Sequence, residues 1–187
     1  SSIGNATYAH PLGFKLVAGS IATKDLIDIN LKKFPSIASQ LANSSDFVIF
    51  DGAPSLGKEA TITAKTADEI LILTNPDLPS VADALKVHVF IKKFNKKLLG
   101  VVVNRVKGKS HELTKREIEK MVGLPVIAEI PEDRNVPKST AAKTLLLDYM
   151  ADSQASAEIR RLAHKLVGKE FSTEQNALSW LFALLRR

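Results

Sequence analysis

The chain contains no cysteine among its 187 residues. Disulfide frameworks, thiolate catalysis and metal sites built on cysteine are therefore excluded, and the absence fits a reducing cytoplasm. Histidine is scarce as well. None of His10, His88, His111 and His164 has the spacing of a metal ligand pair, so we expect each to be structural or solvated.

Long apolar runs are also missing. No stretch approaches the roughly 20 apolar residues that span a bilayer, and the first residues lack the charged-then-apolar pattern of a secretion signal. With 45% hydrophobic and 25% charged residues, the composition favours a soluble cytoplasmic protein with one globular domain and a substantial core.

The net charge of +6 is unevenly distributed. Residues 86–120 contain eleven Lys or Arg against three Glu, which gives this segment +8 and the remainder −2. Such an excess could attract nucleic acid phosphates or anionic lipid. A solvated helix face explains the same charges, and the sequence leaves both interpretations open.

Continuous apolar runs predict strands that are covered on both faces, as in a parallel sheet. Stretches with apolar residues three and four apart separate these runs and predict crossover helices. The repeated order predicts an α/β fold, a doubly wound and mostly parallel sheet with helices on both faces and ligands bound beyond the carboxyl ends of the strands. The predicted strands are residues 14–19, 46–51, 69–74, 97–104 and 125–130.

The stretch FVIFDGAPSLGKEA, residues 47–60, ends an apolar run at Asp51 and continues into a loop with Gly52, Pro54 and Gly57. A carboxylate at this place can hold Mg²⁺ or its water beside a nucleotide phosphate, and the glycines let backbone amides approach an anion. An aspartate there can equally cap the next turn. The pattern alone does not decide between these roles.

Four stretches in chain order resemble the MinD and ParA family of deviant-Walker P-loop ATPases. VVVNR and IPED are typical of archaeal-type MinD proteins, whereas DGAPSLG leans toward ParA. The stretches are DGAPSLG (51–57), ADEILILTNPDLPSVADA (67–84), LLGVVVNR (98–105) and VIAEIPED (126–133). The resemblance implies a dimer that forms with ATP and Mg²⁺. It places Asp51 by the magnesium, through water, and Gly52 by the γ-phosphate.

The resemblance also implies an adenine pocket. It assigns Asn104 to the adenine edge, with Arg105 beside it and Pro131, Glu132 and Asp133 on the other side of the base. An amide can donate to and accept from adjacent adenine atoms, so the chemistry suits the role. The alternative for Asn104 is a cap on the helix that follows.

The chain departs from the family in its phosphate loop. The family pattern places a strand, a K-G-G-x-G-K-T loop, a helix and a first switch aspartate before a region like residues 14–19. Gly108-Lys109-Ser110 imitates the end of such a loop, but Val103 stands where the pattern needs a glycine. We expect residues 1–168 to be the C-terminal portion of a nucleotide-binding domain. These residues should bind no ATP or Mg²⁺ alone, lack ATPase activity and expose apolar surface.

Residues 169–187 form a second signal. A helix over 177–187 would join apolar, aromatic and cationic groups, which suits a membrane interface. MinD proteins resemble this in carrying a C-terminal amphipathic membrane-targeting helix, and packing on the chain's own domain or on a partner is the alternative. The residues of this predicted membrane tail are Trp180, Leu181, Phe182, Leu185, Arg186 and Arg187.

Three functions follow as expectations. The first is a MinD-like ATP switch, cytoplasmic and peripheral to a membrane, that cycles on and off the bilayer in cell division or spatial positioning, with a possible regulatory protein partner. The second is a ParA-like partition ATPase that binds DNA nonspecifically. The third is an interaction or regulatory module without a P-loop.

Overall fold

The computed structural model describes residues 7–17, 31–52 and 56–168. They form two compact units, Ser1–Asp68 (unit 1) and Glu69–Arg187 (unit 2). The predicted membrane tail lies outside the described residues. No helix within the described ranges is long and apolar enough to cross a bilayer.

The described residues of unit 1 form a hairpin and the helices α2 and α3. Strand β1 (Thr7–Ala9) pairs antiparallel with β2 (Lys15–Val17), with Tyr8 opposite Leu16. A 3₁₀ turn, η2 (Leu31–Lys33), leads into α2 (Phe34–Ala42), and α2 contacts α3 (Lys58–Thr66).

Two predicted parallel strands are wrong in unit 1. Residues 15–17 are a strand, but an exposed one in the antiparallel hairpin. Residues 46–51 form no strand, and Phe47 and Ile49 are 67% and 90% exposed. A strand needs a hydrogen-bonded neighbour, which no described segment supplies here. The expected exposure of apolar surface is thereby confirmed for these two side chains.

Unit 2 is built on a parallel sheet in the order β3, β4, β5. Its strands are β3 (Glu69–Thr74), β4 (Lys97–Val106) and β5 (Val126–Pro131), which confirms the three strands predicted there. Its helical segments are α4 (Leu78–Ile91), η3 (Lys92–Phe94), α5 (Lys115–Val122), α6 (Asn135–Ala141), α7 (Leu146–Tyr149) and α8 (Gln154–Leu166).

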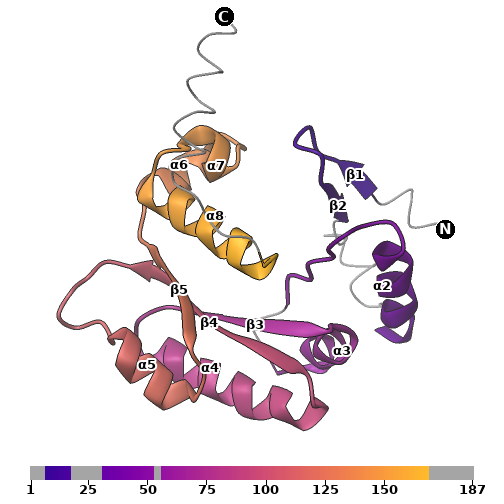
Figure 1. The fold of residues 1–187 in the computed structure, drawn as a ribbon, viewed down its shortest axis with the longest axis horizontal. Coiled ribbons are helices and arrows are strands. Elements are labelled where there is room, and N and C mark those ends of the chain that lie inside the picture. Colours follow the sequence, from indigo (N-terminus) through magenta and orange to yellow (C-terminus); the bar gives the residue numbers. More distant parts are fainter. Residues whose placement is uncertain (1–6, 18–30, 53–55, 169–187) are drawn as a thin grey trace, which may run out of the picture. The chain divides into compact units, whose positions relative to one another are not determined.

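Helices cover both faces of this sheet (Figure 1). Helices α4 and α5 pack against each other on one face, and α8 packs on β5 from the other. The predicted α/β fold with helices on both sides is confirmed. All three strands run the same way, so their carboxyl ends meet at one edge of the sheet.

The core of unit 2 is apolar and lies between the sheet and the α4–α5 layer. Val81, Val101 and Ile118, from α4, β4 and α5, are fully buried. Burial of side chains of this size stabilises by about 1.5–3 kcal/mol each. The complete cluster is Ile72, Val81, Ala84, Val101, Val103, Ile118, Val122 and Val126.

Local signals fix the helix ends. Asp77 caps α4 by accepting from the Ser80 amide at 2.9 Å. Thr114 and Glu117 form a reciprocal capping box at the start of α5. The ring Nδ1 of His88, on α4, lies 2.6 Å from the Val122 carbonyl oxygen at the end of α5. His88 is therefore structural, as expected.

Strand β4 contains two irregularities. Its register against β3 shifts between Leu98 and Gly100, and Gly100 has a φ of +139°. Its register against β5 shifts between Val103 and Val106, and Arg105 has a φ of +60°. Each shift adds one residue to β4, so each is a bulge. The second bulge lies at the carboxyl edge, where ligands of such sheets bind.

Gly100→Ala is expected to destabilise the protein by about 2–4 kcal/mol, because a Cβ atom must displace its neighbours and an L residue is strained at this φ. The added atom would lie 2.6 Å from both the Pro125 carbonyl oxygen and Ile127 Cγ2. Urea unfolding followed by circular dichroism measures the change. Gly108→Ala is the matched control: at a φ of +66° with open space around it, it should cost only about 1–2 kcal/mol. Equal losses of unfolding free energy in Gly100→Ala and Gly108→Ala would contradict the predicted clash at Gly100.

Glu117→Ala is expected to lower the unfolding temperature at pH 7, with a deficit that narrows in acid. The Thr114 hydroxyl and amide hold the pKa of Glu117 below its ordinary value of 4.5. The stabilisation is therefore complete above that value and is lost as pH falls through the folded-state pKa. Thermal melts from pH 7 to pH 3 measure it. Glu129→Ala, at an exposed position of β5 whose side chain has no described hydrogen bond, is the control for loss of a glutamate side chain. A deficit at Glu117 that stays constant with pH argues against the ionised cap.

Candidate functional site

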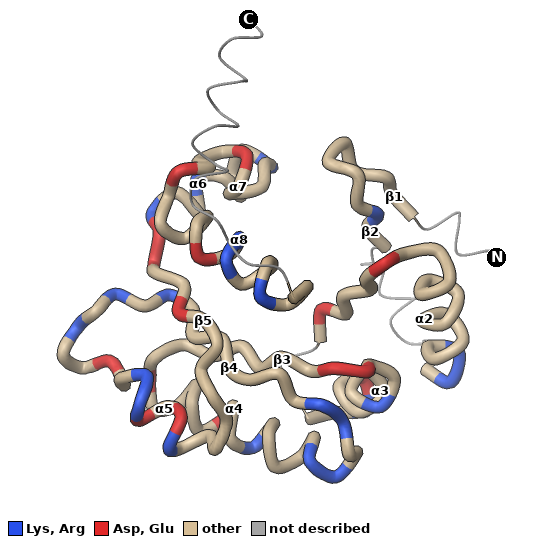
Figure 2. Tube along the Cα trace, viewed as in Figure 1, with Lys and Arg blue, Asp and Glu red and all other residues tan. Residues whose placement is uncertain are grey.

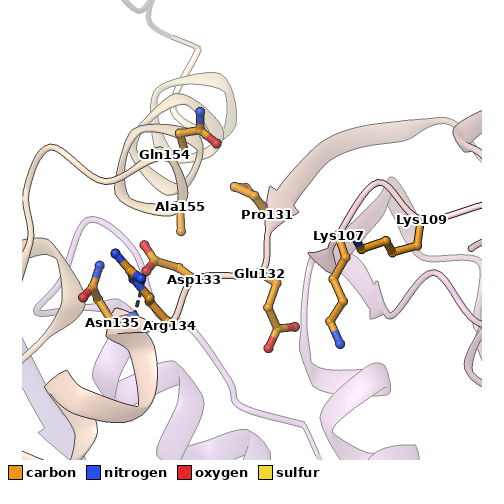
Figure 3. A pocket seen from close by; sticks show the side chains of 9 residues that line it. All are labelled: Lys107, Lys109, Pro131, Glu132, Asp133, Arg134, Asn135, Gln154 and Ala155. Carbon is orange, nitrogen blue, oxygen red and sulfur yellow. Dashed lines mark hydrogen bonds between the residues drawn. The ribbon is translucent and has the colours of Figure 1, made fainter.

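A pocket of about 660 Å³ opens at the carboxyl edge of the unit 2 sheet (Figure 3). Three segments line it: the loop after β4, the segment after β5 and the first turn of α8. Its lining residues are Lys107, Lys109, Pro131, Glu132, Asp133, Arg134, Asn135, Gln154 and Ala155. The structure thus brings Pro131, Glu132 and Asp133 together in a concave site at the predicted edge.

Arg105 and Glu132 join the ends of β4 and β5. Arg105 Nε donates to Glu132 Oε2 at 3.0 Å, and Nη2 donates to Oε1 at 3.3 Å. The Glu132 amide donates to the Val106 carbonyl oxygen at 2.9 Å. Hydrogen bonds from Arg105 hold the pKa of Glu132 below its ordinary value, and the charge of nearby Lys107 adds to the effect. Backbone and side chains therefore connect the bulge of β4 to the loop after β5.

The Asp133 carboxylate is hydrogen-bonded within the protein. Its Oδ1 accepts from the Asn135 amide at 2.8 Å, in the first turn of α6. This bond, with a second from the Ser153 hydroxyl at the start of α8, keeps the pKa of Asp133 low. The carboxylate thus links the starts of two helices beside the pocket, where negative charge is favourable.

Glu112 occupies the loop after β4. Its carboxylate accepts from the amides of Lys107 at 3.0 and 3.1 Å and of Lys109 at 3.2 Å. Desolvation raises the pKa of Glu112, but these backbone donors and that of Gly108 outweigh it and the pKa is lowered. The loop that contains Gly108-Lys109-Ser110 thus binds a side-chain carboxylate of its own chain. This agrees with the interpretation from the sequence that the tripeptide is not the end of a phosphate loop.

Asn104 lies in the second bulge of β4 and is half-buried. It does not line the pocket, although Lys107, three residues later, does. The next helix is α5, whose N-cap is Thr114. The alternative role of Asn104 as a helix cap is therefore wrong. Within the described ranges its amide makes no side-chain hydrogen bond, so its polar atoms have no structural task there.

Asp51 and Gly52 lie in unit 1 and are exposed. Helix α3 begins after Gly57 without a side-chain cap, so Asp51 does not cap that helix. Neither residue lines the second pocket, a space of about 520 Å³ between residues 31–32 and 56–65. In the described part of the chain, no three acidic or histidine side chains gather as a metal cluster. Among the described residues the Asp51 carboxylate has no hydrogen-bond partner, and one carboxylate suits a single ligand of Mg²⁺ or of its water.

The basic segment 86–120 is split by the fold (Figure 2). Lys92, Lys93, Lys96 and Lys97 lie at the end of α4 and the start of β4, whereas Lys107 and Lys109 lie beyond the carboxyl end of β4. The basic residues of α5 are interspersed with Glu117 and Glu119. The +8 segment is consequently several separate surfaces.

Sequence reasoning missed six of the lining residues. Arg134 and Asn135 directly follow the PED tripeptide, so extending that loop would have found them. Lys107 and Lys109 follow a predicted strand end. The first turn of α8, with Gln154 and Ala155, could be found only from tertiary structure, because at least 18 residues lie between it and the other lining segments.

The charges around the pocket favour an anionic ligand. Its two carboxylates, Glu132 and Asp133, already accept hydrogen bonds from the protein. The Lys107 and Lys109 side chains make no ion pair with any described residue, and Figure 3 shows Lys107 directed the same way as Glu132. A nucleotide could use both the polar rim and the positive charge.

Comparison with known proteins identifies the family. Residues 38–182 match the family described as 4Fe-4S iron sulfur cluster binding proteins, NifH/frxC family. Iron–sulfur clusters are held by cysteine thiolates. The chain has no cysteine, so its residues do not fit the cluster in that description.

Similar proteins include an uncharacterized ATP-binding protein of Methanocaldococcus jannaschii, 29% identical over 93% of this chain and 66% of its own length. The septum site-determining protein MinD of Thermotoga maritima is 26% identical over 87% of this chain and 61% of its own length. The chain thus spans somewhat less than two thirds of these curated relatives.

Among solved structures, MinD of Pyrococcus horikoshii, complexed with Mg-ADP, matches with a TM-score of 0.82 and 22% identity, covering 89% of this chain and 69% of that one. This likeness confirms the fold, and the family match extends over most of the chain. The chain therefore belongs to the NifH/frxC family, and it resembles the MinD proteins of the deviant-Walker P-loop ATPases in sequence and in fold.

Proposed function

We propose that this chain contributes the adenine-binding half of a MinD-like ATP switch that cycles on and off a membrane. The observation that carries the proposal is the meeting of the Asn104–Arg105 bulge with the segment 131–133 at the carboxyl edge of the sheet, beside a pocket. Adenine would hydrogen-bond the Asn104 amide and lie against the 131–133 loop. The ATP-binding relative and the Mg-ADP complex of a MinD protein support this choice of ligand.

We further propose that Asp51 and Gly52, in unit 1, serve Mg²⁺ and the γ-phosphate of ATP. The exposed Asp51 carboxylate would hold Mg²⁺ through a water molecule, and the Gly52 backbone, with open space at its missing Cβ, would allow a γ-phosphate to approach. Bound Mg²⁺ supplies charge neutralisation at the phosphates.

The proposed switch couples nucleotide to membrane through dimerisation. ATP would hold two subunits together, and each would present one amphipathic tail from residues 177–187. Two weak anchors joined in one dimer bind far more tightly than either alone, so ATP hydrolysis and separation of the subunits would release the membrane. A regulatory protein could act by changing the lifetime of the dimer.

A second candidate is a ParA-like DNA-partition ATPase. The surface formed by Lys92, Lys93 and Lys96 favours it, since no described side chain forms an ion pair with these lysines. A third is an interaction or regulatory module, favoured by the exposed apolar side chains of Phe47 and Ile49. Both candidates differ from the first in needing no membrane tail.

Asn104→Ala is expected to weaken ATP binding by the full-length gene product by about 1–3 kcal/mol, because the adenine edge loses a buried polar partner. Isothermal titration calorimetry measures it. Asn43→Ala, at an exposed asparagine that follows α2, is the control and should bind like the wild type. Unchanged affinity in Asn104→Ala would remove this residue from the base site.

Leu181→Glu is expected to abolish sedimentation of the ATP-bound full-length product with vesicles at any salt concentration, because it removes apolar burial in the interface. Replacing Arg186 and Arg187 by Gln should weaken binding mainly to anionic vesicles at low salt, since each contributes roughly 1 kcal/mol that salt screens.

Ser179→Glu, beyond the predicted apolar face, is the matched control for added charge and should retain binding to zwitterionic vesicles. DNA gel shifts on the same proteins distinguish the second candidate. Vesicle binding that survives Leu181→Glu, or DNA binding without any vesicle binding, would refute the membrane switch.

A further inference from the structure

The bulge at Asn104 and Arg105 needs a structural cause. Between Val103 and Val106, β4 advances three residues while β5 advances two, from Glu129 to Pro131. Arg105 takes the left-handed φ of +60°, which side-chain-bearing residues adopt rarely and at an energetic cost. Such a bulge re-aims the side chains next to it and persists only where the surroundings hold it.

The surroundings that hold it are contacts to Glu132. The two Arg105–Glu132 hydrogen bonds, at 3.0 and 3.3 Å, form a fork that fixes orientation as well as distance. The Glu132 amide adds a third bond to Val106, the residue that ends the bulge. The bulge is therefore held at Arg105 and at Val106 by one residue of the neighbouring loop.

Exposure shows that this ion pair contributes little as a stabiliser. The side chains of Arg105 and Glu132 are 61% and 34% exposed. Exposed ion pairs contribute little to stability because water and salt screen them and the side chains lose freedom. The effect of the pair is geometric, since it sets the conformation of the residue directly after Asn104.

We propose that Arg105 and Glu132 are positioning residues for base recognition: their ion pair holds the β4 bulge so that the Asn104 amide and the 131–133 loop address the same base. The inference rests on the proposed adenine site. It gives the two side chains a role that requires no contact with the nucleotide. It also makes base selectivity depend on an ion pair that contributes little to the stability of the protein.

The test compares ATP with ITP, whose base lacks the exocyclic amine, on the full-length gene product by calorimetry. Arg105→Ala and Glu132→Ala should each weaken ATP binding about tenfold, within the range for coupled neighbours, and leave ITP binding nearly unchanged. The double variant should lose no more than either single one, because both remove the same interaction. Unfolding temperatures should stay close to that of the wild type.

Two further variants sharpen the result. Glu132→Gln keeps the shape of the side chain and should lose part of the ATP preference. Lys97→Ala removes the ion pair to Glu69, which also joins β4 to a neighbouring strand but lies at the other end of β4. This matched control should bind both nucleotides like the wild type.

The outcomes separate the two proposals. Wild-type ATP selectivity in both Arg105→Ala and Glu132→Ala overturns the positioning role, and if Asn104→Ala still loses ATP, the adenine site stands. Equal weakening of ATP and ITP, or additive losses in the double variant, also overturns it. A wild-type product that binds no adenine nucleotide overturns the adenine site and the positioning role together.

Discussion

The burial of β4 is the constraint on which unit 2 depends. Val101, Val102 and Val103 are at most 1% exposed, and neighbouring strands satisfy the backbone on both sides. Side chains on both faces of the strand are thus removed from water. Within β4, the backbone takes a positive φ at Gly100 and Arg105. The buried centre of β4 therefore ends beside the pocket, and the bulge at Arg105 lies between the buried residues and the pocket.

The acidic and basic side chains at the pocket differ in whether they have partners within the protein. Glu112, Glu132 and Asp133 each accept hydrogen bonds from nearby backbone or side-chain donors, and each consequently has a lowered pKa. The side chains of Lys107 and Lys109, on the same rim, form no ion pair with a described carboxylate. A site that has satisfied its own anions and kept cations available is prepared for an anion from outside. This physical state, rather than any single residue, connects the fold to a nucleotide.

Sequence reasoning predicted unit 2 well because its signals are local. Apolar runs mark β3, β4 and β5, and apolar residues three and four apart mark α4 and α5, without knowledge of the rest. It failed at residues 46–51, because an apolar run predicts burial but cannot supply the partner that makes a strand. It placed Pro131, Glu132 and Asp133 at one edge, and the structure confirms that edge. It could not show that Arg105 is bulged or that α8 completes the pocket, since both depend on register and on distant packing.

The connections of unit 2 have a consequence for synthesis on the ribosome. Helix α4 links β3 directly to β4, and α5 links β4 directly to β5, so every sheet neighbour is also the next strand in the chain. Contacts of short sequence separation form quickly, and domains begin to fold as they emerge. A β3–α4–β4 layer can therefore assemble before β5 is translated. Strand β4 then has one unpaired edge only until about 25 further residues have been added, at about 5–20 residues per second.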